Sequence, residues 1–197
     1  VLIGASVTTT GDQSFNNDAQ ITGATVNLDA GGDVTLGSTV AVGANALSVT
    51  ADNVELGGNF GGTGTVTISG NDASDNMALG GNPADAANQI ELSGTELGRL
   101  ATASLATITL GRADSTGATS IDTFDLSATT SDLNIFAGSI TDGGGTLTMS
   151  SGDLQLRAST GIGTSADPIE TAGLTDVAAV TNTGGIFLSN SGSGNVN

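Results

Sequence analysis

The 197-residue sequence predicts an all-β fold, a parallel β-helix or solenoid, from three observations. Short apolar–x–apolar triplets recur along the chain, clusters of turn residues separate them, and in the first third they follow one another about every six to eight residues. Alternation with a period of two buries one face of a strand and leaves the other in water. Three such strands make a coil of roughly 20–24 residues, which is the size of a solenoid repeat.

The triplets define the expected strands, and their middle residue is polar except at Ala41 and Phe187. Gly, Asn, Asp and Ser clusters such as 29–33 and 142–145 lie between them and predict turns. At a spacing of about 4.8 Å, the chain would supply about eight or nine coils in a rod about 40 Å long. The triplets occupy residues 26–28, 34–36, 40–42, 47–49, 54–56, 66–68, 90–92, 108–110, 124–126, 133–135, 147–149, 154–156 and 186–188.

An antiparallel β-sandwich is the alternative all-β fold, because it uses similar short strands and turns. Hairpin turns favour Asn-Gly and Asp-Gly pairs, and Asp142-Gly143 is the main one here. Sandwich cores usually contain large aromatic residues, whereas this chain has five Phe and no Trp or Tyr. The sequence therefore favours the solenoid.

One short helix is expected near residues 95–101, after the strand 90–92. Leu97 and Leu100 have helical i, i+3 spacing, and Thr95 is the expected N-cap. The segment 83–88 leads into this region with a proline and small residues. We expect the helix to form a corner between two coils.

Composition excludes several functions. The net charge of −17, with three Arg and no Lys, argues against binding nucleic acid or anionic membrane surfaces. No apolar run approaches the roughly 20 residues that span a bilayer. The start of the chain is too short for a signal peptide, so we expect residues 1–197 to be one β-helix domain and a segment of a longer chain.

Missing residue types also exclude most catalysis. Without His, Cys or Lys, the Ser-His-Asp, Cys-His and Ser-Lys arrangements are all impossible. Paired carboxylates alone can cleave a glycosidic bond, and Asp72 and Asp75 are a candidate pair. Both lie in the polar segment 70–76, where Asp is an ordinary turn residue. We therefore expect no enzyme activity and assign no catalytic, cofactor-binding or metal-binding residue.

Calcium and ice are two ligands that other solenoids bind. The calcium-binding nonapeptide frame fits residues 61–69, but Val66 stands where the ligand Asp belongs. Incidental calcium at Asp29 with Asp33, or at Asp72 with Asp75, stays open. Thr-x-Thr segments at 65–67, 107–109 and 146–148 are too few and too widely spaced in the sequence to predict a regular ice-binding ladder.

Several stretches follow one another in an order that chance would rarely produce: 5–16, 32–37, 60–68, 90–100, 108–114, 161–171 and 185–190. The most specific reads I-E-L-S-G-T-E-L-G-R-L and then I-T-L-G-R-A-D. It resembles the L-T-D-A-E-L-x-R-L … I-T-I-G-R-A-D element in the repeat region of very large filamentous-haemagglutinin-like secreted exoproteins and adhesins. The resemblance implies a right-handed parallel β-helix, export across the outer membrane, and a role in adhesion or surface structure. No secretion domain of that family is apparent here.

The ends of a solenoid are open strand edges, which pair with any strand they meet unless a cap covers them. The apolar residues 1–3 and the polar residues 189–197 contain no recognisable cap. We therefore expect an extracellular or cell-surface filament segment whose partners, end to end, are further copies of itself or flanking β-helix coils. The alternative is an adhesin stalk or module that binds host or environmental glycans and surfaces.

Overall fold

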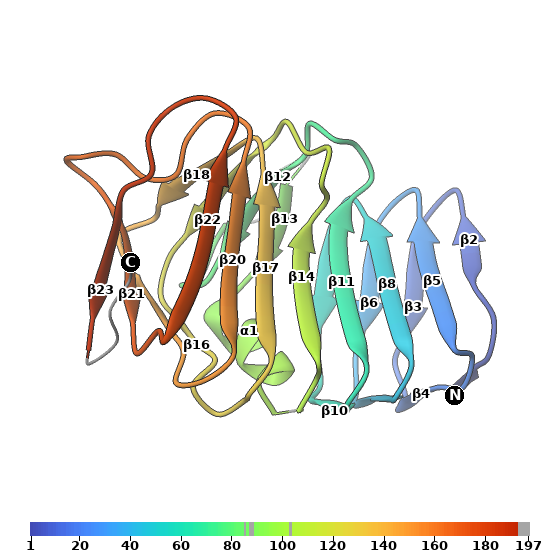
Figure 1. Cartoon of the computed structure of the whole chain (residues 1–197). Helices are drawn as coiled ribbons and strands as arrows, with labels where there is room; N and C mark the ends of the chain where they lie inside the picture. The colour runs from blue at the N-terminus through green and yellow to red at the C-terminus, as the bar shows by residue number, and fades with distance from the viewer. Residues whose placement is uncertain (85, 87–88, 103, 193–197) are drawn as a thin grey trace.

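The chain winds into a right-handed parallel β-solenoid of about nine turns (Figure 1). This computed structural model describes residues 1–84, 86, 89–102 and 104–192, so part of the segment 83–88 and the last five residues lie outside the described residues. Every pairing between the named strands is parallel. The predicted solenoid is confirmed, and the antiparallel sandwich is excluded.

Eight strands form the long sheet, which runs the length of the molecule (Figure 1). Its strands are β2 (Val7–Thr9), β5 (Thr25–Ala30), β8 (Ala46–Ala51), β11 (Thr65–Gly70), β14 (Thr107–Gly111), β17 (Asp132–Ala137), β20 (Asp153–Ala158) and β22 (Asp176–Thr181). Polar side chains alternate with buried ones along the inner strands, as expected of a strand with one face in a core.

A second face is made of two four-stranded sheets. All but the last of their strands precede a strand of the long sheet in the chain, so both sheets lie on one side of the coil. The first contains β1 (Leu2–Ile3), β4 (Ala19–Ile21), β7 (Val40–Gly43) and β10 (Phe60–Gly62). The other contains β16 (Phe124–Asp125), β19 (Thr146–Thr148), β21 (Ile169–Ala172) and β23 (Leu188–Ser191).

The third face follows the long sheet in each coil and is also divided in two. Its first part contains β3 (Gln13–Phe15), β6 (Val34–Leu36) and β9 (Val54–Leu56). The second contains, in order of pairing, β13 (Gln89–Leu92), β12 (Asn76–Leu79), β15 (Ala118–Ile121) and β18 (Ser139–Asp142). Single parallel bridges from Ile140 to Ile162 and on to Ile186 extend it to the last coil.

One register runs through all eight strands of the long sheet. Its central column, which points into the core, contains Val7, Leu28, Val49, Ile68, Leu110, Ile135, Leu156 and Ala179. Neighbours in this column are 19 to 25 residues apart, except Ile68 and Leu110, which are 42 residues apart. The long turn contains β12, β13 and the helix.

Helix α1 (Gly94–Leu100) takes the place of a strand on the second face, between β10 and β16. Its N-cap is Ser93, not the predicted Thr95, because Ser93 and Glu96 form a reciprocal capping box. Leu97 and Leu100 are buried as predicted. The expectation of a simple corner was incomplete, since the helix replaces a whole rung of the second face.

The side chains of α1 also satisfy the edge of β9. Glu96 Oε1 accepts a hydrogen bond from the Leu56 backbone N–H at 2.9 Å, and the Arg99 guanidinium donates to the Leu56 carbonyl. Partial desolvation raises the pKa of the nearby Glu55 carboxyl, and repulsion from Glu96 raises it further. The helix thus closes a break between the two parts of the third face.

The core is a continuous stack of Leu, Ile, Val and Ala side chains along the solenoid axis. Most predicted triplets supply it, but the triplet 186–188 is not one strand. Ile186 ends the third face, whereas Leu188 begins β23 on the second face. Sequence analysis missed short strands such as β4, β12 and β22, whose inward residues include Ala or Met in place of a Val or Leu pair. No helix among the described residues is long and apolar enough to cross a membrane.

Candidate functional site: the two open ends of the solenoid

Exposed apolar side chains gather at the two ends of the molecule. Among the described residues, the large apolar side chains that stay exposed are Val1, Leu2, Val180, Ile186 and Phe187. The first two begin the first coil, and Leu2 is 71% exposed. The other three belong to the last coil, where Val180 is 52% exposed. Exposed apolar surface that is confined to particular places marks sites of association.

Each end also presents unpaired strand edges. In the long sheet, β2 has a neighbour only on the β5 side, and β22 has one only on the β20 side. Backbone N–H groups of alternate residues point to opposite sides of a strand. Because the Asn182 N–H bonds back to Ala158, the N–H of the alternate residue Ala179 points to the open edge. The last rung is thus set to pair with another strand.

The first coil contains a buried polar group that sequence analysis did not find. Gln13 is 5% exposed and occupies the inward position where the next coils have Val34 and Val54. Its Nε2 donates to the carbonyls of Val7 and Asp29, at 3.1 and 2.8 Å. Its Oε1 has no hydrogen-bond partner among the described residues. The first coil is therefore more polar inside than the second and third.

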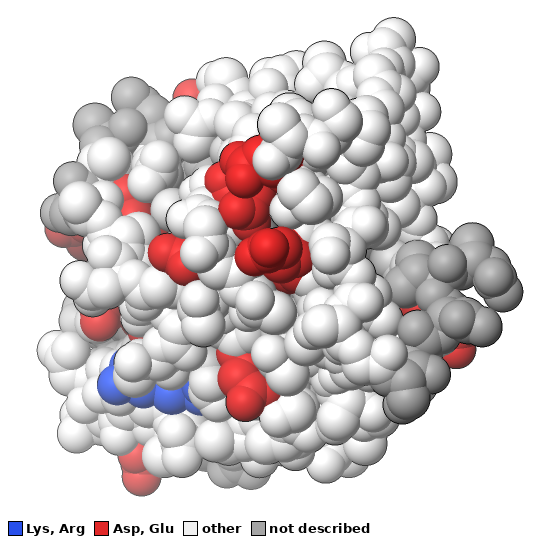
Figure 2. All heavy atoms as spheres, turned by 90° about the vertical axis from the view of Figure 1, so that its left-hand side faces the viewer, with Lys and Arg blue, Asp and Glu red and all other residues white. Residues whose placement is uncertain are grey.

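The C-terminal end is largely uncharged. Figure 2 views the molecule from this end, and most of the surface there belongs to residues other than Asp, Glu, Lys and Arg. The acidic residues form small separate groups, with one basic group among them (Figure 2). An uncharged end allows close contact even though the whole chain carries a net charge of −17.

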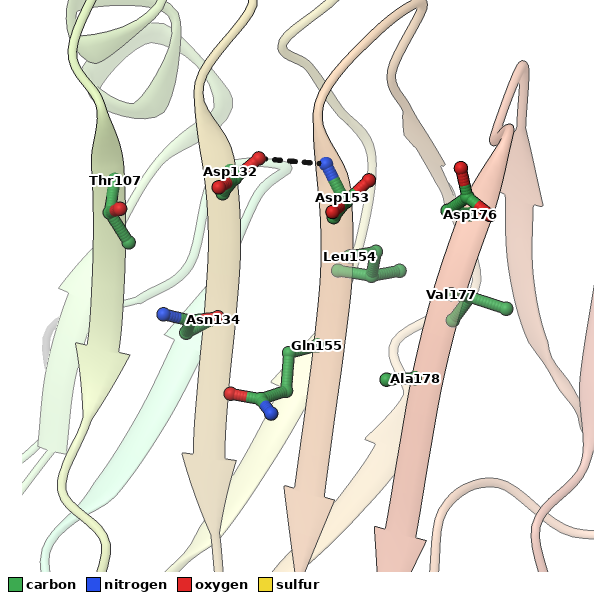
Figure 3. Close-up of a pocket in the computed structure, with 9 residues that line it drawn as sticks. All are labelled: Thr107, Asp132, Asn134, Asp153, Leu154, Gln155, Asp176, Val177 and Ala178. Carbon is green, nitrogen blue, oxygen red and sulfur yellow. Dashed lines mark hydrogen bonds between the residues drawn. The ribbon is translucent and has the colours of Figure 1, made fainter.

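The largest hollow among the described residues is a groove of about 450 Å³ on the outer face of the long sheet. Asp132, Asp153 and Asp176 stand side by side across β17, β20 and β22 (Figure 3). Asn134 and Gln155 form a second row beside them (Figure 3). The three aspartates are 21 and 23 residues apart, so the coil period is the sequence signal that would have aligned them.

Like charges at neighbouring positions of a sheet repel and destabilise it. Replacing the middle carboxylate, Asp153→Asn, is therefore expected to raise the free energy of unfolding by about 0.5–1 kcal/mol at low ionic strength. Urea denaturation at about 0.01 M and 1 M salt checks this, because the gain should fall as salt screens the charges.

Asp29→Asn is the matched control for this prediction. Asp29 is exposed on the same sheet, but its register partners are the uncharged Thr8 and Thr50. The control should leave stability within about 0.5 kcal/mol of the wild type. Equal gains for both variants would indicate that total charge, and not the row of aspartates, sets the effect.

The candidate carboxylate pair serves the backbone of a turn. Asp75 is buried, and its Oδ2 accepts a hydrogen bond from the Asp72 N–H at 2.8 Å, while Asp72 is exposed. Both lie between β11 and β12. The arrangement is that of an Asp that stabilises a turn.

The other candidate ion-binding pair is also divided between different tasks. Asp29 is exposed on β5, whereas Asp33 lies in the following turn and its backbone N–H bonds to the Asp12 carboxylate. Among the described residues, no three Asp or Glu side chains are grouped so that they could hold a metal ion. Incidental calcium at these pairs stays a prediction.

The expectation that the Thr-x-Thr segments lie too far apart was wrong for two of them. Thr65 pairs with Thr107, and Thr67 pairs with Thr109, because the 42-residue turn places β14 directly on β11. The third segment lies on β19, in another sheet. The result is a block of four threonines on two neighbouring rungs.

Comparisons of this chain with protein-family models, with curated proteins and with solved structures gave no match. The resemblance to filamentous-haemagglutinin-like repeats therefore stays a prediction from the sequence motifs. The fold and the two open ends carry the functional conclusion.

Proposed function

We propose that this chain is an extracellular structural protein, a β-helix segment of a bacterial cell-surface filament whose copies associate end to end. The observation that carries the proposal is that the large exposed apolar side chains and the unpaired edges of the long sheet occur together at the two ends. A contact between the C-terminal end of one copy and the N-terminal end of the next uses two different surfaces. Such a head-to-tail contact propagates into an open filament.

Composition supports the same proposal. A net charge of −17 keeps the sides of the rods apart and soluble, while the ends are the apolar part of the surface. Parallel strands added at an end would continue the hydrogen bonding and the small-side-chain packing of the solenoid. The extracellular, bacterial location rests on the sequence resemblance to secreted exoproteins.

Assembly of the purified chain tests the proposal. Sedimentation velocity and electron microscopy at 0.15 M salt should find fibres one solenoid wide. Growth should be slower at about 0.01 M salt, where the Debye length of about 30 Å leaves the repulsion between copies unscreened. A chain that stays monomeric at high concentration would contradict self-association, and its ends would then be covered by other coils.

A matched pair of lysine variants shows whether the ends make the contact. Ala179 is partly buried on the inner side of the last rung, and Ala178 faces outward beside it. An inward charge on an edge strand opposes edge-to-edge pairing. Ala179→Lys should therefore weaken association at least about tenfold, a loss of roughly 1.4 kcal/mol. Ala178→Lys adds the same charge and should assemble as the wild type does.

A further inference from the structure

The constant register of the long sheet specifies how a second copy would add to it. The central column begins at Val7 and ends at Ala179 without a shift between strands. One further rung in the same register places Val7 of the second copy beside Ala179 of the first. Counting back three residues along both strands, Gly4 of the second copy then lies beside Asp176.

Side chains in the solenoid repeatedly accept a hydrogen bond from the coil that follows. In each case an Asp or Asn oxygen bonds to the backbone N–H of the residue directly beside it in the next coil. The bonds are Asp33 N–H to Asp12 Oδ1 at 3.0 Å, Ala118 N–H to Asn76 Oδ1 at 2.8 Å and Asp153 N–H to Asp132 Oδ1 at 3.0 Å. The last of these is drawn in Figure 3.

Asp176 stands in the same row as Asp132 and Asp153, but on the last rung of the sheet (Figure 3). We propose that the Asp176 carboxylate accepts a hydrogen bond from the Gly4 N–H of a second copy, in a junction where β2 of that copy pairs with β22. This inference rests on the proposed function and names the atoms of its contact. It gives Asp176 the role that Asp132 has inside the rod.

The junction also requires a strand exchange on the second face. β23 lies one rung beyond β21, so it reaches the level that β1 of the second copy occupies when β2 joins β22. β1 is two residues long, and its flanking carbonyls, Val1 and Ile3, accept from Gln20 and Thr22 at 2.8 and 2.9 Å. In the junction, β23 takes the place of β1 beside β4.

Two substitutions of Asp176 separate its charge from its acceptor. Asp176→Asn keeps an oxygen that can accept and removes the repulsion within the row, so it should assemble at or below the wild-type concentration. Asp176→Ala removes the acceptor and should raise the assembly concentration about tenfold, because hydrogen bonds to charged groups are worth about 1.5–3 kcal/mol. Equal assembly of the alanine variant and the wild type would overturn the role of Asp176.

Disulfide formation tests the register independently, since the chain has no cysteine. A mixture of Ser6→Cys and Ala178→Cys copies should crosslink, because these outward positions lie side by side in the junction. Thr8→Cys with Ala178→Cys should not, because a shift of two residues exceeds the roughly 7 Å limit between Cα atoms. The reverse pattern would overturn the register.

Removing residues 1–3 tests the exchange. The shortened chain should assemble at the wild-type concentration or below it, because β23 no longer has to displace β1. Loss of assembly in a folded, shortened chain would contradict the exchange. If the wild type does not assemble at all, the proposed function fails. If it assembles but these variants and crosslinks disagree, only the junction described here fails.

Discussion

Ile68→Ala is expected to lower the free energy of unfolding by about 2–5 kcal/mol. Ile68 is fully buried in β11, between Val49 and Leu110 of the central column. Removing three carbons there loses buried apolar surface and leaves a cavity that the stacked neighbours cannot fill, because their strands are held in one register. Chemical denaturation measures the loss, and hydrogen exchange should show it centred on β8, β11 and β14.

Thr67→Val is the control for the core prediction. Thr67 is the preceding residue on the same strand, and its side chain is half-buried on the outer face. This change keeps the branched shape of the side chain and should alter stability by no more than about 0.5 kcal/mol. A similar loss for both variants would mean that the inner column does not dominate stability.

Glu96→Ala is expected to lower the free energy of unfolding by about 3 kcal/mol. The buried carboxylate accepts from the Leu56 N–H and from the N–H and Oγ of Ser93, at 2.8–2.9 Å. Alanine removes these acceptors together, and each buried N–H left without a partner costs about 1–3 kcal/mol. The amide of Leu56 should also exchange faster, because its hydrogen bond leaves the sheet and depends on the helix.

Glu96→Gln separates the acceptor from the charge. Its amide oxygen can still accept from the Leu56 N–H, so the loss should be about 1 kcal/mol and the Leu56 amide should stay protected. If Glu96→Ala lost less than about 1 kcal/mol, the helix would not be the element that closes the edge of β9.

Local pattern predicted much of the fold. Val34 and Leu36, or Leu154 and Leu156, show the alternation that buries one side of a strand, and the structure places both pairs in the core. Short inward residues carry a weaker signal: Val177, Ala179 and Thr181 line β22, yet the sequence contains no clear triplet there. Their strand forms because the edge of β20 pairs with it, which is a tertiary effect.

The candidate site was predictable in kind but not in detail. Open ends follow from any solenoid without recognisable caps, and the sequence analysis expected function there. The exposure of Phe187 could not be foreseen, because its triplet predicts one strand whereas the chain turns a corner between Ile186 and Leu188. Likewise, Asp176 acquires meaning only from the register that places it beside Asp153.

By itself, the sequence determined the strand-and-turn repeat, the short helix and the lack of nucleophile–base chemistry, since these depend on residue type and on spacing over a few positions. The tertiary structure alone decided which distant residues become neighbours. Thr65 lies beside Thr107 and Asp153 beside Asp176 because stacking of coils sets the register, and one long turn shifts every later partner. Hydrogen bonding between coils is non-local, so no short window of sequence contains it.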